Sequence, residues 1–296
     1  MTRIYLHADD AGVSRNATRR IAECWENGFI DGYSIIANEE CYDIISDSLN
    51  KFPGKRANLS VHLNLTDGNC LNQKSLNSLI ASPNGRFKLT FLKAFLMIFK
   101  GNKTRKKFTE EVFNEWDQQI YSIKKVLGKR EIDALDSHNH VHMLPCLFEI
   151  IIKLSEKHGV KKTRFAREIL VANNVMDIFK PFFWKNTLKW FVINSLYLHI
   201  RNKNYAINPK AAYITGILYS GRMSPNNVKK AIAKINRIGG ASVEVVYHPG
   251  RALPDEMTDW ALSNRAKDFF TREWRDREYE TAKIIKNECG SYFENN

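Results

Sequence analysis

Short apolar segments alternate with amphipathic segments along most of the chain. Residues 4–8 form an apolar run, and the apolar side chains of residues 17–25 then recur at helical spacing behind Ser14, a favourable N-cap residue. The same patterns predict further strands at 33–37, 59–65, 132–135, 211–215 and 242–247, and further helices at 108–127 and 225–237. Strands that alternate with helices in this way indicate a mainly parallel α/β fold.

Polar side chains gather where the predicted strands end. Asp9-Asp10, His62, Asp136–His138 and His248 each follow or close an apolar run. An open doubly wound sheet binds ligands near one switch point, whereas a β/α barrel collects all its strand-end loops at one mouth. Four well-separated segments therefore favour a TIM-like (β/α) barrel, regular or distorted, with the active site at the C-terminal ends of the strands.

Length and composition fit one soluble globular domain. The 296 residues are 44% hydrophobic and 26% charged, and single barrels often reach this size. We expect one domain over residues 1–296, with a basic, aromatic insertion at about 170–210. The five cysteines are odd in number and form no CxxC pair, and no signal-peptide pattern precedes the first strand. These features predict a cytoplasmic protein, peripheral at the inner face of the membrane if the insertion binds lipid.

The chain is strongly basic. It carries 45 Lys and Arg against 32 Asp and Glu, a net charge of +13, which favours anionic partners. Ten of the basic residues fall between 161 and 210, where only Glu168 and Asp177 oppose them. No RRM, KH, zinc-finger or helix-turn-helix pattern is present, so we expect no nucleic acid partner. A solvated basic face explains the same charges equally well.

Residues 181–203 are unusually aromatic and are flanked by Lys185, Lys189, Arg201 and Lys203. A core helix or a contact within a homodimer accounts for this pattern. The other interpretation is a patch that binds an anionic membrane surface. We expect a homodimer, and the sequence leaves the role of this segment open.

Histidines and aspartates supply the candidate chemistry. If the strand continued through residues 136–142, His138, His140 and His142 would point to the same side. Imidazole is the commonest metal ligand near neutral pH, and carboxylates complete mixed nitrogen and oxygen sites. Asp9 and Asp10 would point to opposite sides of their strand, so one can ligate a metal while the other acts as a base.

Four motifs resemble one known family in its order and at its spacing. They are His7–Gly12, Val61–Gly68, Leu135–His142 and Tyr247–Gly250. The chain is similar through them to the YdjC-like carbohydrate deacetylases, which include the ChbG-type chitooligosaccharide deacetylases. The helix before the third motif also fits the family, with Glu115 and Gln119 four residues apart.

The resemblance implies a hydrolase that removes N-acetyl groups from an amino sugar and releases acetate. Its metal ligands would be Asp10, His62 and His138, its catalytic base Asp9 and its general acid His248. The metal would be one divalent ion, Mg²⁺ or Zn²⁺, with Mn²⁺ and Co²⁺ also suited to such ligands. The substrate would be an N-acetylated oligosaccharide, a polysaccharide precursor or a lipid-linked sugar.

Five further residues are candidates for supporting roles. Asp136 is expected to orient a ligand histidine. His140, His142, Arg164 and Arg167 are expected either to support the metal ligands or to contact the substrate.

Two other functions remain open at this point. A phosphoesterase-like metal hydrolase could use an Asp/His/His site on a similar barrel, although two-metal phosphoesterases usually need more bridging carboxylates. The net positive charge also allows a non-catalytic protein that binds an anionic ligand.

Overall fold

One parallel sheet organises the molecule. The computed structural model describes residues 1–172, 177, 179–257, 260 and 263–289, so part of the predicted insertion at 170–210 lies outside the described residues. Eight strands run in the order β6-β5-β4-β3-β2-β1-β8-β7, and every neighbouring pair is parallel. They are β1 (Arg3–Ala11), β2 (Gly32–Ile35), β3 (Asn58–Leu63), β4 (Ala134–Ser137), β5 (Lys162–Thr163), β6 (Asn208–Pro209), β7 (Tyr213–Thr215) and β8 (Ser242–Tyr247).

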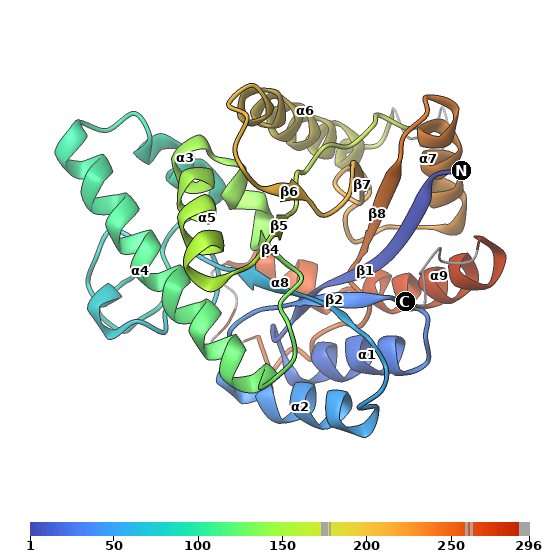
Figure 1. The fold of residues 1–296 in the computed structure, drawn as a ribbon, viewed down its shortest axis with the longest axis horizontal. Helices are drawn as coiled ribbons and strands as arrows, with labels where there is room; N and C mark the ends of the chain where they lie inside the picture. The colour runs from blue at the N-terminus through green and yellow to red at the C-terminus, as the bar shows by residue number, and fades with distance from the viewer. Residues whose placement is uncertain (173–176, 178, 258–259, 261–262, 290–296) are drawn as a thin grey trace.

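The sheet curls into a half-barrel. Strands β5 and β6 are only two residues long, and the chain just beyond β5 reaches across to β7. There the Ile214 amide donates to the Arg167 carbonyl at 2.8 Å, beside a parallel bridge between Glu168 and Ile214. The prediction of a parallel α/β fold of distorted TIM-like form is therefore confirmed (Figure 1).

Helices flank the curled sheet (Figure 1). They are α1 (Arg15–Glu26), α2 (Tyr42–Lys51), α3 (Phe91–Met97), α4 (Asn102–Leu127), α5 (Pro145–His158), α6 (Pro181–Arg201), α7 (Pro225–Arg237), α8 (Asn264–Thr271) and α9 (Trp274–Cys289). Ser14 caps α1 as predicted, because its side chain accepts a hydrogen bond from the Ala17 amide. Within the described part of the chain, no helix combines the length and the apolar character that a membrane span requires.

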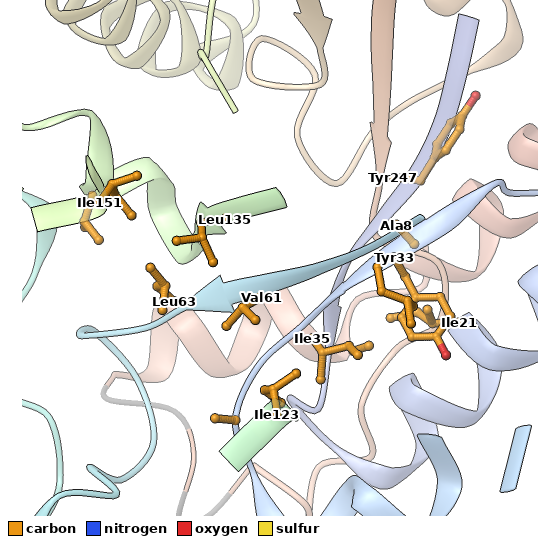
Figure 2. Packing of buried hydrophobic residues seen from close by; sticks show 14 of the residues in the cluster. Ala8, Ile21, Tyr33, Ile35, Val61, Leu63, Ile123, Leu135, Ile151 and Tyr247 are labelled. Atoms are coloured by element: carbon orange, nitrogen blue, oxygen red, sulfur yellow. The ribbon is translucent and has the colours of Figure 1, made fainter. Parts of the chain in front are cut away.

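The core lies between the sheet and its helices. Val61 and Leu63 of β3 and Leu135 of β4 are fully buried, and they pack with Ile123 of α4 and Ile151 of α5 (Figure 2). These are the alternating and helically spaced apolar positions of the sequence, so hydrophobic burial sets the strand registers. Those registers fix where each strand ends and hence where its terminal polar residues lie.

One local prediction is wrong. The strand β4 stops at Ser137, and His138–Met143 forms a 3-10 turn (η3). Asn139 and His140 adopt left-handed backbone angles there, with φ of 57° and 55°. The two-residue alternation of a strand is lost after Ser137, so the three histidines do not share one direction.

Candidate active site

The strand ends meet around a cavity of about 740 Å³. Its lining includes Asp9 and Asp10 from the end of β1, His62 from β3, His138 just after β4 and His248 just after β8. All five residues are at least nine-tenths buried. The structure thus brings together the predicted metal ligands and the predicted proton-transfer pair.

Asp10, His62 and His138 form a cluster that fits a metal ion. The Asp10 Oδ1 atom lies 3.0 Å from His138 Nδ1 and 3.6 Å from His62 Nε2, and one donor atom from each residue falls within 4.8 Å of the other two. Ligand atoms about 2 Å from a zinc ion lie roughly 3–4 Å from one another. Asp10 has a φ of 70°, a left-handed conformation that aspartate tolerates better than most residues.

Asp136 fixes the orientation of His62. Its Oδ1 atom lies 2.7 Å from His62 Nδ1, while Ser34 donates its hydroxyl proton to Oδ2 at 2.6 Å. The Nδ1–H of His62 is thereby engaged and Nε2 faces Asp10. A carboxylate behind a histidine is the usual support of a metal-binding imidazole, which is the role predicted for Asp136.

The cluster attracts positive charge. Burial lowers the pKa of His138, but the neighbouring Asp10 and Asp67 carboxylates outweigh burial and raise it to about 9. For Asp10 the effects are opposite in sign: burial alone would raise its pKa, but the neighbouring His138 and Arg275 hold the pKa well below its usual range. The Asp10 carboxylate is therefore ionised and draws positive charge toward the cluster. A divalent cation would satisfy the same carboxylate and leave both histidines neutral.

Arg164 and Asp9 form a buried, bidentate ion pair. The guanidinium donates from Nη1 to Asp9 Oδ2 at 2.7 Å and from Nη2 to Asp9 Oδ1 at 2.8 Å. It also donates twice to Glu244 at 3.0 Å. Burial alone would raise the pKa of Asp9, but Arg164 holds it well below its usual range. Asp9 is therefore an ionised, rigidly held carboxylate, and each oxygen keeps a second lone pair.

A second cluster of possible ligands is occupied by cationic side chains. His7, Asp9 and Asp136 also place donor atoms within 4.8 Å of one another. Arg164 contacts both of those carboxylates, and Lys210 Nζ lies 3.1 Å from the His7 ring nitrogens. Since these two cations already neutralise the group, and His7 and Asp136 do not line the cavity, the Asp10 cluster is the better metal site.

Replacing Arg164 with Met should lower the free energy of unfolding by about 3–5 kcal/mol, because it leaves buried carboxylates without their partner. Arg167 is the matched control. It is half-buried, and its guanidinium lies 4.2 Å from the Tyr213 ring centre, away from the cavity lining. Arg167→Met should cost less than about 1 kcal/mol. Urea unfolding of the two variants checks this difference, and equal losses would contradict the role given to Arg164.

His248 is held by Glu278 of α9. The His248 amide donates to Glu278 Oε2 at 2.6 Å, and the ring Nδ1 lies 3.5 Å from the same oxygen. The ring stands edge-on to Phe269 at 5.8 Å. These contacts place the imidazole at the cavity wall.

The other two histidines of the third motif differ in their placement. His142 is fully buried between the Ser137 hydroxyl at 2.6 Å and the Arg164 carbonyl at 2.8 Å, so it supports the turn and does not line the cavity. His140 does line the cavity. Burial, with Lys189 nearby, holds its pKa well below the usual value, so its ring is neutral.

Several supporting residues escaped the sequence prediction. Arg275 of α9 donates to Asp10 Oδ2 at 3.1 Å, and one of two arginines in a polar helix gives no signal of that contact. Glu244 could have been found, because it is a charge inside the otherwise apolar strand β8. Glu115 was noted only as a family feature. It is fully buried and accepts hydrogen bonds from the Leu71 and Asn72 amides, which anchors the loop after β3.

Comparison with known proteins gives one consistent family. The model of the family described as YdjC-like protein matches residues 3–284. A carbohydrate deacetylase of Listeria welshimeri is 27% identical over 197 residues, which cover 66% of this chain and 74% of that protein. Carbohydrate deacetylase 1 of Listeria innocua is 31% identical over 55% of this chain and 60% of its own length. A chitooligosaccharide deacetylase of Salmonella paratyphi B is 25% identical over 53% of this chain and 57% of its own length.

A solved structure shares the fold. It comes from Enterococcus faecalis, from a protein whose name provisionally assigns it to cellobiose-phosphate cleavage. The two chains superpose with a TM-score of 0.61 at 18% identity, over 95% of each. This likeness supports the curled-sheet architecture over nearly the whole chain.

Proposed function

Because the chain belongs to the YdjC-like protein family, we propose that it is a carbohydrate N-deacetylase that works with one divalent metal ion. The observation that carries the proposal is the Asp10–His62–His138 cluster, which lines the same cavity as Asp9 and His248. The named deacetylases among its relatives support the same activity.

The residues present suit a divalent cation. One carboxylate oxygen and two imidazole nitrogens form a mixed ligand set that leaves positions open for water and substrate. Zn²⁺, Mg²⁺, Mn²⁺ and Co²⁺ are all compatible with it. The cation, when bound, would lower the pKa of a water molecule and polarise the acetyl carbonyl.

The chain's own residues account for the proton transfers. Asp9 would accept a proton from the attacking water as the new C–O bond forms, and Arg164 keeps that carboxylate ionised and aimed. His248 would donate a proton to the sugar nitrogen as the amide C–N bond breaks, because a free amine leaves far more readily than an amide anion. The products are acetate and the free amino sugar.

Two finer points belong to the same proposal. The substrate is an N-acetylated oligosaccharide, polysaccharide precursor or lipid-linked sugar. We place the enzyme in the cytoplasm, since all five cysteines lie in the described part of the chain and none is in a disulfide.

The test is a product assay that separates reaction classes. The purified protein is incubated with N-acetylated sugars and, in parallel, with sugar phosphates and other phosphate esters, in the presence of each candidate metal. We expect acetate release from at least one N-acetylated sugar and no phosphate release. Phosphate release without acetate release would instead favour the phosphoesterase alternative.

A further inference from the structure

The net positive charge of the chain arises from two segments. Between Asp67 and Glu110 the sequence has nine Lys and Arg and no acidic residue. Between Asp177 and Glu244 it has eleven and again no acidic residue. The rest of the chain holds 25 basic and 32 acidic residues, so these two segments carry the whole net excess.

Both segments border the active-site cavity. The first contains α3, and Leu89–Leu92 at its start line the cavity. The second contains α6, and residues from Phe182 to Ile193 line it as well. Residues far apart in the sequence thus frame one opening, and both stretches are free of carboxylates.

The outer side of α6 exposes large apolar side chains to solvent. Trp184, Leu188, Phe191 and Leu198 are 60%, 66%, 61% and 56% exposed. Spacings of four, three and seven residues place them on one strip of the helix. The opposite side packs into the protein through Ile193, Tyr197 and Ile200. Neighbouring apolar side chains exposed on one surface usually mark an interaction site, so the exposed strip calls for a cover.

The exposed side of α3 and the turn after it has the same character. Leu92, Leu96 and Phe99 are 63%, 50% and 71% exposed, and Lys93 and Lys100 lie among them, also exposed. We name the exposed residues of α3 and of the turn after it, together with the outer strip of α6 and the exposed Arg201 and Lys203 at the end of that helix, the α3–α6 face. Leu92 and Leu188 belong both to this face and to the cavity lining, so the face adjoins the cavity opening.

We propose that the α3–α6 face docks on the surface of an anionic phospholipid bilayer. Aromatic and leucine side chains enter the boundary between headgroups and acyl chains, while Lys and Arg bind anionic headgroups. Docking would bring the cavity opening to an amino sugar anchored in that membrane, a consequence that rests on the proposed deacetylase function.

Two other covers fit less well. A second copy of the chain would bring together two basic surfaces whose segments contain no Asp or Glu, and their positive charges would repel. Nucleic acid would satisfy the charges but offers no apolar layer for the Leu and Phe side chains. The combination of charge and exposed apolar area is what an anionic bilayer accommodates.

The test measures sedimentation with vesicles. The full chain is mixed with vesicles of phosphatidylcholine alone, or of phosphatidylcholine with phosphatidylglycerol, at low and high salt. We expect binding to the anionic vesicles only, and weaker binding at high salt because ions screen the charges. Absence of binding, or equal binding to both vesicle types, overturns the proposal.

Variants locate the binding surface. Lys93, Lys100, Arg201 and Lys203, all exposed, are replaced together by Gln. Each charge contributes about fivefold to the partition coefficient, so the variant should bind roughly 600-fold more weakly. A second variant combines Trp184→Ser, Phe191→Ser and Phe99→Ser, and should also lose binding.

Control variants lie outside both segments. Arg19→Gln with Lys129→Gln removes exposed charge, and Ile284→Ser with Tyr121→Ser removes exposed apolar area. Both controls should bind like the wild type. If controls and face variants lose binding equally, the face is not the docking site. If the wild type stays off vesicles and the face variants convert a dimer to a monomer, the cover is a second copy and the proposal is wrong.

The assay needs no enzymatic turnover, so its outcome is separate from that of the proposed function. The face variants should keep the wild-type rate on a soluble N-acetylated sugar. Their rate on an N-acetylated glycolipid in anionic vesicles should fall below that of the wild type. Equal loss on both substrates would contradict the docking role.

Discussion

Asp9→Asn should retain its metal ion and lose about 10²–10⁴-fold in kcat for deacetylation, the usual contribution of a general base. The substitution removes a carboxylate that lines the cavity but is paired with the Arg164 side chain and is not one of the three proposed metal ligands. His248→Ala should show a loss of the same size with its metal retained, since its ring lies beside Glu278 and is not part of the metal cluster. Steady-state kinetics with metal analysis of each variant checks both.

A fold control is essential for Asp9, because the amide would meet the Arg164 guanidinium with an N–H where an oxygen now accepts. Urea unfolding must show that the variant is folded under the assay conditions. If Asp9→Asn empties the metal site while Asp10→Asn leaves it filled, the roles given to the two aspartates are reversed.

His62→Ala and His138→Ala should each abolish stoichiometric metal binding and, with it, detectable acetate release. Each change removes one of three protein ligands from a small cluster, and a divalent ion held by the remaining two would dissociate readily. Metal content after gel filtration, measured by mass spectrometry, is the direct readout.

His158 provides the matched control for this pair. It lies on α5, bonded to Asp117 at 2.8 Å and outside the cavity lining, so His158→Ala should keep both metal and activity. Full metal content in both His62→Ala and His138→Ala would place the metal elsewhere.

The site residues that could be predicted are those that follow a local pattern of apolar residues in the sequence. Asp10 and His62 follow apolar runs whose burial fixes the strand registers, and parallel strands bring their C-terminal ends to one mouth. The turn at Asn139 and His140 was missed because two non-glycine residues in left-handed conformation leave no pattern.

Contacts between distant segments could not be predicted. Arg275 lies 265 residues from Asp10 in the sequence, and only the packing of α9 against the barrel brings them together. Arg164 was expected either to support the metal ligands or to contact the substrate, but its ion pair with Asp9 was not predicted. Arg164 is fully buried, since three carboxylates from β1, β4 and β8 converge on it.

The most direct test of the central claim is a titration of metal-free wild-type protein with a divalent ion, following acetate release from an N-acetylated sugar. We predict no activity without metal, a rate that rises in proportion to bound metal, and a plateau at about one ion per chain. Full acetate release by the metal-free protein, or no release at any metal occupancy with every N-acetylated sugar tried, would contradict the account.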